Sequence, residues 1–480
     1  MTGRADAARP AAVVVGGGLA GITTALRLAE AGHRVTLAEG RPRLGGLAFS
    51  FQRGDLTVDN GQHVFLRCCT AYRGLLERLG ATRMTHLQDR LDVPVLSVTG
   101  PAGAPVRTLG RLRRAGLPVP LHLAGSLARY PHLSPADRAR VVRGALALKG
   151  LDLADPALDG LSFGEWLRRN GQNAATTAAL WDLVGVATLN ARADQVSLAL
   201  AAMVFKTGLL SDPGASDIGI AAVPLGAIHH DRALAELERA GVRVLLRARV
   251  AELKPAAPQH AVRLEGGQSG TGELLTADTV VLAGAQDTAA ALLPPGAVPH
   301  RLEDFGTTPI LNVHVVYDRK VLRRPFFAAL GSPVQWVFDR TTHSGLAGTP
   351  IGRAHPGAQY LALSQSAVQD EIDLPVAELR ERYLPELARL LPAAAGAEVL
   401  DFFVTRERTA TFDGAPGSAA LRPGATTGVP GLLLAGAWTA TGWPATMEGA
   451  VRSGHAAADA ALAAAGARVP VDRGDGRWPR

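Results

Sequence analysis

Three glycines near the start of the chain have the spacing of a dinucleotide site. Gly16, Gly18 and Gly21 follow an apolar run at 11–15 and open a helical pattern. Gly16 allows a tight turn, Gly18 lets the backbone approach a pyrophosphate, and Gly21 lets the helix pack on the strand. Free N–H groups at the start of such a helix attract phosphate. We expect a dinucleotide here, against the alternative of a glycine turn without a ligand, and the first helical turn adds two more contacts, Leu19 and Ala20.

The next predicted strand ends on an acid. Residues 34–38 form a second apolar run that closes on Glu39, eighteen residues after Gly21. Strand, helix and strand together make a βαβ unit, which is the architecture of a dinucleotide-binding fold. A carboxylate at this place accepts hydrogen bonds from the ribose hydroxyls of an adenosine. The first glycines alone do not distinguish FAD from NAD, but Gly45 and Gly46 follow, and this pair suits a long cofactor that runs further over the sheet.

A second strand–turn–helix lies near the other end of the chain. Residues 432–435 are apolar, small residues follow at Gly436 and Ala437, and a long helix is expected over 445–465. The start of that helix could meet an anionic or carbonyl end of the cofactor.

Composition excludes several classes of protein. The chain has 480 residues, of which 47% are hydrophobic and 19% charged, as in ordinary globular proteins. It has 50 basic and 43 acidic residues, but aromatics are 5% and arginines are scattered, so we expect no nucleic-acid partner. The two cysteines are adjacent, Cys68 and Cys69, and cannot build a disulfide framework. No apolar run approaches the ~20 residues of a spanning helix, and the first twelve residues lack the apolar core of a signal peptide. We expect a cytoplasmic protein without a metal.

The predicted elements indicate an α/β fold with two interleaved domains. A Rossmann-like FAD-binding domain is expected in three parts, and a substrate domain of mixed sheet with a helical insertion is expected between them. Helix starts are predicted at Ser134 and Ser162, where a hydroxyl can cap a helix. Residues 242–250 are predicted to form one continuous strand. The predicted order is 1–90 FAD-binding, 91–224 substrate domain with the insertion, 225–300 FAD-binding, 301–409 substrate-domain sheet, 410–467 FAD-binding, and 468–480 a loose tail.

The ends of the chain resemble flavoprotein amine oxidases and carotenoid-type desaturases. Within that superfamily they resemble most the hydroxysqualene dehydroxylase family, also described as squalene-associated FAD-dependent desaturases. The segments that carry the resemblance are 58–66, 405–412, 421–424 and 444–454. The similarity covers nearly the whole chain in order, although the middle, 112–210, resembles the family mainly in length and helical character.

The resemblance implies which residues hold FAD. Besides the two glycine motifs and Glu39, it implies that Val250 contacts the adenine through its backbone, Gly436 lies near the ribityl chain, and Met447 and Glu448 lie near the flavin ring. Two positions depart from the family pattern, where an acid is usual at Ala437 and an arginine at Leu47. Losing one such polar contact costs on the order of 1 kcal/mol, about tenfold in affinity.

The chemistry that the resemblance implies is reductive removal of the allylic hydroxyl of hydroxysqualene, a C30 isoprenoid, to give squalene. A leaving hydroxyl needs a proton or strong hydrogen-bond donors. The candidates are Asn60, Gln62, His63 and Glu448. If residues 60–63 form a strand, Asn60 and Gln62 face one way and His63 the other. Structural alternatives are a histidine packed on the cofactor and, for Glu448, an acid that stabilises a helix start.

Two other functions stay open. A carotenoid or phytoene desaturase would run the flavin in the opposite direction, and a cofactor-free isoprenoid-binding protein would have lost the flavin. Because no second Gly-x-Gly-x-x-Gly unit follows a later strand, we expect an external electron donor. The stretch 109–130 mixes arginines with leucines and contains Pro118 and Pro120. It is either a peripheral contact with an anionic membrane surface or a solvated loop.

Overall fold

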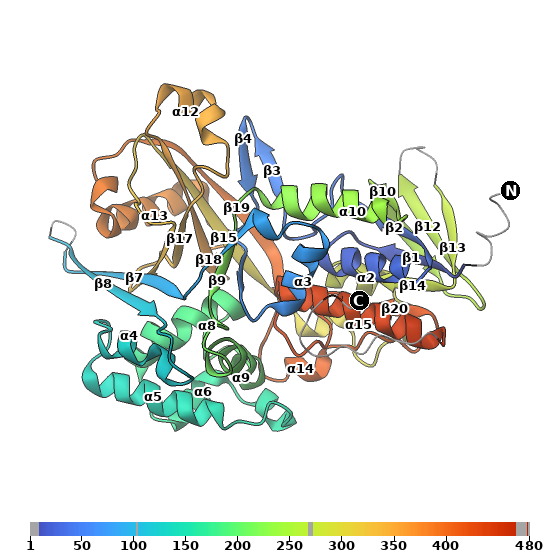
Figure 1. Ribbon diagram of the computed structural model, residues 1–480, viewed down its shortest axis with the longest axis horizontal. Helices are drawn as coiled ribbons and strands as arrows, with labels where there is room; N and C mark the ends of the chain where they lie inside the picture. The colour runs from blue at the N-terminus through green and yellow to red at the C-terminus, as the bar shows by residue number, and fades with distance from the viewer. Residues whose placement is uncertain (1–8, 102–103, 267–271, 467–477, 479–480) are drawn as a thin grey trace.

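The computed structural model describes residues 9–101, 104–266, 272–466 and 478. Two sheets of different kinds dominate it, each with its own layer of helices, and they lie side by side along the long axis (Figure 1).

The first sheet has five parallel strands in the order β10-β2-β1-β14-β20. Their bounds are β1 Ala11–Val15, β2 Arg34–Glu39, β10 Arg243–Leu246, β14 Thr279–Leu282 and β20 Leu432–Leu434. In β1, Ala12 and Val14 pack into a core with the helices of one face, whereas Val13 and Val15 pack into a second core on the opposite face. Successive strand residues point to opposite faces, so a run that is apolar throughout is what a sheet covered on both sides requires.

Helices cover one face of this sheet and a small antiparallel sheet covers part of the other. The helices are α2 Leu19–Glu30, α3 Thr70–Arg78, α10 Ala233–Arg239 and α15 Met447–Ala464. The antiparallel strands are β11 Ala248–Lys254, β12 His260–Gly266 and β13 Leu274–Ala277. Both βα units predicted from the glycine patterns are therefore confirmed.

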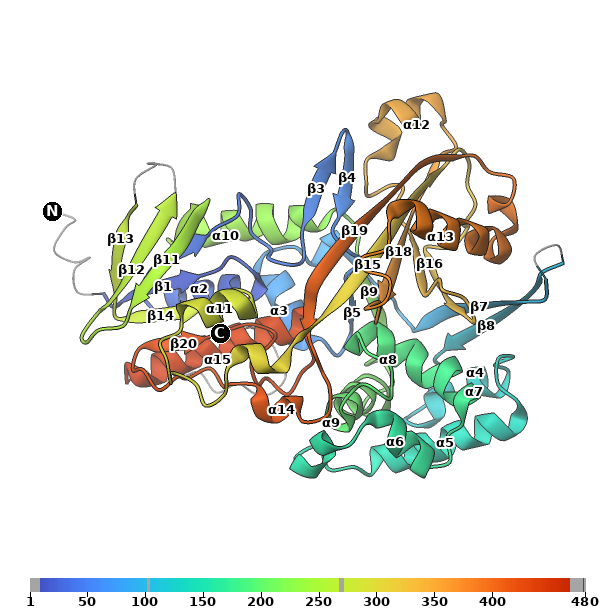
Figure 2. The same cartoon turned by 180° about the vertical axis from the view of Figure 1, so that it is seen from behind.

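The second sheet has seven strands in the order β19-β15-β18-β17-β16-β7-β8, antiparallel except for β16 and β7. Figure 2 shows the long strands β15 and β19 running toward the five-stranded sheet. The bounds are β7 Asp92–Thr99, β8 Val106–Arg113, β15 Thr307–Tyr317, β16 Phe326–Leu330, β17 Trp336–Asp339, β18 Gln359–Ser366 and β19 Val399–Phe412. Helix α13, Val376–Leu390, packs its apolar side on this sheet.

A helical segment follows β8, as predicted for the middle of the chain. It contains α4 Ala124–Ala128, α5 Pro135–Lys149, α6 Phe163–Arg169, α7 Ala174–Thr176, α8 Asp182–Leu189 and α9 Leu198–Phe205, with π-helical turns at Thr177–Trp181 and Lys206–Leu210. The Ser134 hydroxyl accepts a hydrogen bond from Asp137 N, and the Ser162 hydroxyl accepts one from Glu165 N. Both predicted helix caps are confirmed.

Short elements complete the fold. The strands are β3 Ser50–Arg53, β4 Leu56–Asp59, β5 Val64–Leu66, β6 Thr85–Leu87 and β9 Ile218–Ala221, and the helices are α11 Gln286–Leu292, α12 Pro350–Ala354 and α14 Ser418–Leu421. Single 3-10 turns span Thr82–Met84, Leu121–Leu123, Pro156–Gly160, Leu302–Phe305, Leu346–Gly348 and Pro392–Ala394.

One strand expected from the sequence is wrong. The run 242–250 was expected to be continuous, but it is divided between β10 and β11, which belong to different sheets. Arg247 separates them with φ 57°, a left-handed conformation that is uncommon outside glycine. No glycine or proline marks this break in the sequence. The predicted loose tail lies outside the described residues except for Trp478, whose indole N–H donates to Glu30 Oε2 over 2.9 Å.

Candidate active site

A cavity of about 1010 Å³ opens between the two sheets and the helical segment. It brings together most of the residues expected to bind a cofactor or a substrate, from both ends of the chain. Those that line it are Gly16, Gly18, Leu19, Ala20, Glu39, Gly45, Gly46, Asn60, Gln62, His63, Val250, Gly436, Ala437, Met447 and Glu448. Gly21 lies behind this wall, and its contribution is packing, because a Cβ there would lie 1.9 Å from Gly16 O.

The glycines form a cradle that side chains would fill. Gly16 has φ +111°, and a Cβ on it would lie 2.7 Å from Ala283 O. A Cβ on Gly46, which has φ +57°, would lie 2.9 Å from Gly18 Cα. Helix α2 begins in this cradle, and neither a side-chain cap nor an acid occupies its first turn. The free N–H groups there fit a pyrophosphate.

The Glu39 carboxylate stands beside the cradle and is already oriented. Its Oε2 accepts a hydrogen bond from Gly17 N over 2.7 Å, and its Oε1 accepts one from Arg41 N over 2.7 Å. Each oxygen keeps a further lone pair for a ribose hydroxyl. The residues present therefore fit the adenosine diphosphate half of FAD.

The start of α15 and the turn before it line the cavity, as the second expected strand–turn–helix. Gly436 N donates to Ser453 Oγ over 2.8 Å, and a Cβ on Gly436 would lie 2.3 Å from the indole nitrogen of Trp438. The Thr446 hydroxyl caps α15 by accepting from Gly449 N. Trp438 and Trp443 both line the cavity, although Trp438 is nearly buried and donates to Gly284 O.

Glu448 was a catalytic candidate, but its carboxylate already has other partners. It accepts hydrogen bonds from Ala71 N over 3.1 Å and Tyr72 N over 2.7 Å, and it pairs with Arg452 over 2.7 Å. The two N–H groups belong to the first turn of α3, where an acid is favourable. Burial raises the pKa of Glu448 against the opposing pull of Arg452. This geometry supports its structural alternative.

The expected alternation of Asn60 and His63 is wrong. The chain bends at Asn60 and Gly61 instead of continuing as a strand, and β5 begins only at Val64. As a result His63 Nε2 lies 3.3 Å from Asn60 Oδ1, so the two side chains meet on the same side. The protein around His63 shields its ring from water, and this burial lowers its pKa to about 4. At neutral pH its ring is therefore uncharged, and Nε2–H donates to Asn60.

The side chain of Asn60 uses its full hydrogen-bonding capacity on the protein. Its nitrogen donates to Leu47 O over 2.7 Å and to Glu407 Oε1 over 3.1 Å. Its Oδ1 accepts from Phe49 N over 3.1 Å as well as from His63. An amide has two donor hydrogens and two acceptor lone pairs, and all four are occupied. Asn60 therefore holds its neighbours in place and has nothing left for a substrate.

Three polar residues of the second sheet join this cluster and were not identified from the sequence. The backbone oxygen of Asn60 accepts from Asn312 Nδ2 over 3.0 Å and from the Thr405 hydroxyl over 3.0 Å. The third residue, Glu407, lies two positions beyond Thr405 in β19, on the same face. Glu407 lies within the segment 405–412 that carries the family resemblance. The sequence alone did not indicate that its side chain faces Asn60.

The far end of the cavity is an apolar chamber. Its walls come from the helical segment and from β7, β8 and β17. Unlike the polar residues around Asn60, the residues of these walls are apolar. The chamber residues are Leu91, Val93, Leu112, Leu123, Leu180, Leu183, Val184, Ala187, Met203, Val204, Leu209, Ile218, Trp336 and Phe338. Apolar walls of this kind desolvate an aliphatic chain and bind it through burial alone.

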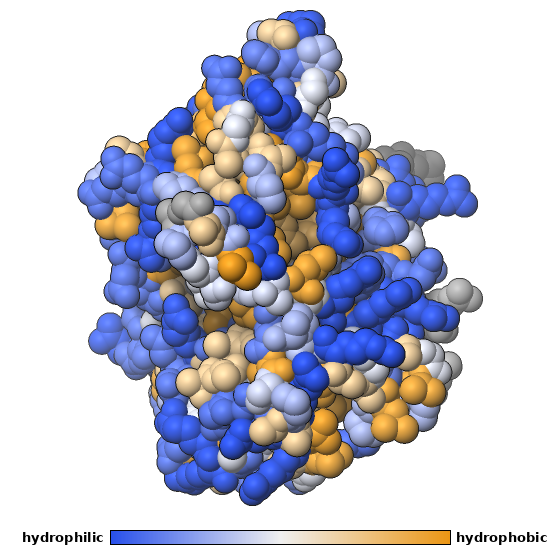
Figure 3. All heavy atoms as spheres, turned by 90° about the vertical axis from the view of Figure 1, so that its left-hand side faces the viewer, coloured by the Kyte–Doolittle hydropathy of each residue, from blue (hydrophilic) through white to orange (hydrophobic). Residues whose placement is uncertain are grey.

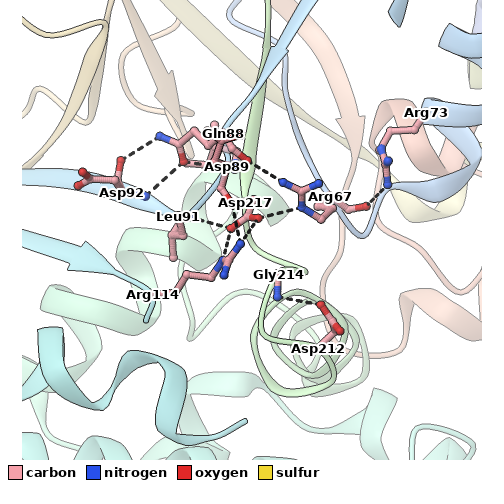
Figure 4. A network of polar contacts seen from close by, with 11 residues as sticks. Arg67, Arg73, Gln88, Asp89, Leu91, Asp92, Arg114, Asp212, Gly214 and Asp217 are labelled. Carbon is pink, nitrogen blue, oxygen red and sulfur yellow. Dashed lines mark hydrogen bonds and ion pairs between the residues drawn. The ribbon is translucent and has the colours of Figure 1, made fainter. Parts of the chain in front are cut away.

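A buried ion cluster fixes the chamber walls to the cofactor side (Figure 4). Asp217 is fully buried and accepts from Arg67 Nε over 2.8 Å, from Arg114 Nη2 over 2.7 Å and from Leu91 N over 2.7 Å. Burial alone would raise the pKa of Asp217, but the two guanidinium groups and Leu91 N outweigh it and hold that pKa below its ordinary value. Arg67 directly precedes Cys68, and both Cys68 and Leu91 line the cavity. The cluster therefore joins two segments of the cavity wall through Asp217.

Part of the expected membrane-facing stretch is tied to the protein instead. Arg114 points inward to Asp217, and Arg111 forms an ion pair with Asp92. His122 is buried, whereas Leu109, Leu117 and Leu121 are about half exposed. Figure 3 looks onto the end of the molecule that carries β7, β8 and α4, where apolar side chains gather among hydrophilic ones around a hollow.

Cys68 and Cys69 are free thiols, and both line the cavity. Across the described ranges, no cluster of three or more His, Cys, Asp or Glu side chains could bind a metal ion. Nor is any helix within those ranges long and apolar enough to cross a bilayer.

Comparison with known proteins identifies the family. The model of the family described as flavin containing amine oxidoreductase matches residues 19–462. Hydroxysqualene dehydroxylase of Rhodopseudomonas palustris is 29% identical over 94% of this chain and 98% of its own length. The 15-cis-phytoene desaturase of Narcissus pseudonarcissus is 28% identical over 92% of this chain and 77% of its own length.

Solved structures support the fold. A putrescine oxidase bound to putrescine superposes with a TM-score of 0.65 at 20% identity, covering 95% of this chain and 98% of that one. Cyclohexylamine oxidase from Brevibacterium oxydans also gives 0.65, at 18% identity, covering 95% and 99%. The chain therefore belongs to the flavin-containing amine oxidoreductase family and is an FAD-dependent oxidoreductase.

Proposed function

We propose that this enzyme is a hydroxysqualene dehydroxylase, which removes the allylic hydroxyl of hydroxysqualene and yields squalene for squalene and hopanoid biosynthesis. Three relatives with that name, at 26–29% identity, each align over 94% of this chain. The observation that carries the proposal is the cavity itself. It joins a dinucleotide cradle to a long apolar chamber, with one polar cluster at Asn60 between them.

The proposed FAD contacts follow the cradle and the cavity wall. They are Gly16, Gly18, Leu19, Ala20, Gly21, Glu39, Gly45, Gly46, Val250, Gly436, Ala437, Met447 and Glu448. When bound in its reduced state, FAD supplies a hydride to the substrate carbon.

The protein positions the substrate, keeps water away from it and offers hydrogen bonds to its hydroxyl. The apolar chamber holds the C30 chain and excludes water, which suits an allylic carbon whose charge is delocalised. Gln62 lines the cavity, and its side-chain amide bonds to no other described residue, so it is available for a substrate hydroxyl. His63 is neutral and held by Asn60. We assign the hydrogen bond to the leaving oxygen to Gln62, whereas His63 uses its one N–H to hold Asn60 in place.

The reduced flavin needs electrons from outside the chain. The sequence contains one dinucleotide motif, and the cradle around Gly16 accounts for it. We therefore propose that a separate reductase or free reduced flavin acts as the external electron donor.

We also propose that the enzyme takes its substrate from an anionic membrane surface. Residues 101–150 contain nine basic residues and one acidic residue, Asp137. Leu109, Leu117 and Leu121 are exposed beside Leu112 and Leu123, which line the chamber. Exposed leucines and an excess of arginine favour such a surface. Wild-type protein should co-sediment with vesicles containing anionic lipid, and the double variant L117D/L121D should not. Equal sedimentation of both proteins would contradict this contact.

The main alternative is a phytoene-type desaturase, because such enzymes are also relatives, at 25–28% identity. Anaerobic incubation with hydroxysqualene, FAD and a reductant separates the two. Squalene formed only with the reductant supports the dehydroxylase. A flavin-loaded protein that forms no squalene would contradict it and favour oxidation of a carotenoid precursor. The third interpretation, a binding protein without cofactor, finds no support in a chain of this family.

A further inference from the structure

The polar cluster contains one acceptor with no protein partner. Asn312 is fully buried and lines the cavity, and its Nδ2 donates to Asn60 O over 3.0 Å. Its Oδ1 has no hydrogen-bond partner among the described residues. A buried acceptor without a partner lowers the stability of the protein, so such a group in a cavity wall indicates a donor on a ligand. Gly61 and the His63 ring border it, since a Cβ on Gly61 would lie 3.6 Å from Asn312 Oδ1 and 3.6 Å from His63 Nε2.

A carboxylic acid lies next to this acceptor. Asn312 pairs with Thr405 across β15 and β19, and Glu407 pairs with Ile310, one step along the same face. Asn60 Nδ2 donates a hydrogen bond to Glu407 Oε1 over 3.1 Å. The neighbours of Glu407 in β19 point elsewhere, because Arg406 donates to Ile372 O and Leu374 O, and Arg408 pairs with Asp373.

The other acids of the cavity wall have tasks elsewhere. Glu39 belongs to the cradle, and Glu448 is bound to α3 and Arg452. Asp287 accepts from Thr288 N, and Glu303 pairs with Arg301. Glu407 forms no ion pair within the part of the chain that the structure describes.

We propose that Glu407 is the acid that protonates the leaving hydroxyl and that Asn312 orients this hydroxyl by accepting its hydrogen bond. The assignment rests on the proposed function. The Glu407 carboxyl proton passes to the substrate oxygen, the C–O bond breaks, and water leaves. The substrate carbon takes a hydride from the reduced FAD of that reaction, so the alcohol is reduced to the alkene hydrocarbon and FAD is oxidised. Solvent then returns a proton to Glu407.

The surroundings of Glu407 stabilise the carboxylate that proton transfer leaves behind. Arg43 interacts electrostatically with Glu407, and its guanidinium lies over the Phe49 ring at 3.3 Å and donates to Gly46 O. Burial lowers the pKa of Arg43 to about 10, so it remains charged at neutral pH. Its positive charge attracts the Glu407 carboxylate after the proton has left. His63, which reaches Glu407 through Asn60, is uncharged.

The variant Glu407→Gln tests the assignment, because a glutamine retains an oxygen for Asn60 but has no acidic proton. Squalene formation should fall about 100- to 10,000-fold, the usual contribution of general acid catalysis. FAD content and the rate of flavin reduction by dithionite should stay at wild-type values. The matched control is Arg408→Gln, on the opposite face of the same strand, which should retain full activity.

A substrate analogue makes the test specific to protonation. When chloride replaces the hydroxyl, the leaving group needs no proton, so Glu407→Gln should lose far less activity on the chloride than on the alcohol. Equal losses on both substrates, or near wild-type activity on the alcohol, would overturn the proposal. If Glu407→Gln does not fold, Glu407→Ala with added formate replaces it, and restored activity is expected whereas its absence contradicts the role. A wild-type enzyme that forms no squalene would instead refute the proposed function.

Discussion

The side-chain nitrogen of Asn60 donates a hydrogen bond to Glu407 Oε1 over 3.1 Å, joining residues 347 positions apart in the chain. Asn60 lies where the chain bends after β4, and Glu407 lies in β19 of the seven-stranded sheet. Both residues line the cavity, and the proposed chemistry depends on this contact between them.

Replacing Asn60 by alanine should remove its hydrogen bond to Glu407. The variant leaves several buried donors and acceptors unpaired, so its free energy of unfolding should fall by about 1–3 kcal/mol in urea titrations. Its kcat should fall strongly while KM changes little, because the apolar chamber is intact. In a double-mutant cycle with Glu407→Gln, the loss in kcat should be much less than additive. Fully additive losses would show that Asn60 affects catalysis independently of Glu407.

Gly46→Ala should weaken cofactor binding. The new Cβ would lie 2.9 Å from Gly18 Cα, and φ is +57°, where an alanine costs roughly 1–2 kcal/mol. We expect FAD affinity to fall about tenfold, measured by titration of the apoprotein. Gly185→Ala in α8 is the control, since its Cβ would contact nothing within 4 Å. Unchanged affinity in Gly46→Ala would mean that the cradle does not hold the pyrophosphate.

Ala437→Asp should strengthen FAD binding. The position lines the cavity directly after Gly436, and an acid there could accept a hydrogen bond from a ribityl hydroxyl. One added contact of about 1 kcal/mol corresponds to a gain of about fivefold to tenfold in affinity. The same titration measures it, and weaker binding than wild type would place the ribityl chain elsewhere.

Arg340→Met should destabilise the protein. Arg340 and Asp59 form an ion pair at 2.7 Å with side chains only 8% and 6% exposed. Removal of one partner from a buried pair costs about 3–5 kcal/mol, since the remaining charge is buried alone. The exposed pair of Arg319 and Asp318 is the control, where Arg319→Met should cost at most about 1 kcal/mol. Urea titrations with similar midpoints for both variants would contradict this.

Acid should destabilise the protein partly through His314. This ring is fully buried between Tyr360, Thr405 and Phe403, and burial lowers its pKa to about 3. An unfolded histidine has a pKa of about 6.5, so the unfolded state binds more protons below that pH. The stability is therefore complete above pH ~6.5 and is lost as pH falls toward 3, by about 1.4 kcal/mol per pH unit.

His314→Gln removes this group and should make the fall in unfolding free energy between pH 6 and pH 4 shallower by that amount. The exposed His300, changed to glutamine, is the control and should leave the slope unchanged. Urea titrations at several pH values give both slopes. Identical slopes in wild type and His314→Gln would show that His314 is not buried as a neutral ring.

The sequence predicted those features whose causes are local. The turn from β1 into α2 depends on Gly16 and its neighbours, and the caps at Ser134 and Ser162 depend on one hydroxyl and a following N–H. Such signals lie within a few residues of the structure that they specify.

Features that depend on the register of distant strands were not predictable. Glu407 faces Asn60 only because β19 pairs with β15 in a register that includes a bulge near Thr308. The bend at Asn60 and Gly61 reversed the expected side of His63, and the left-handed Arg247 divided one expected strand between two sheets. No glycine or proline marks the break at Arg247, where tertiary contacts impose the backbone conformation. Asn60-Gly61 is a turn signal and Pro309 stands at the bulge, but neither shows which distant side chains will meet there.

The direction of electron flow tests the central claim most directly. Enzyme with its FAD reduced in advance is mixed with hydroxysqualene under anaerobic conditions, while flavin absorbance and squalene are measured together. The account predicts that the flavin is reoxidised and that one squalene forms for each flavin. A flavin that stays reduced with hydroxysqualene, while oxidised enzyme is reduced by a carotenoid precursor, would contradict it and identify a desaturase.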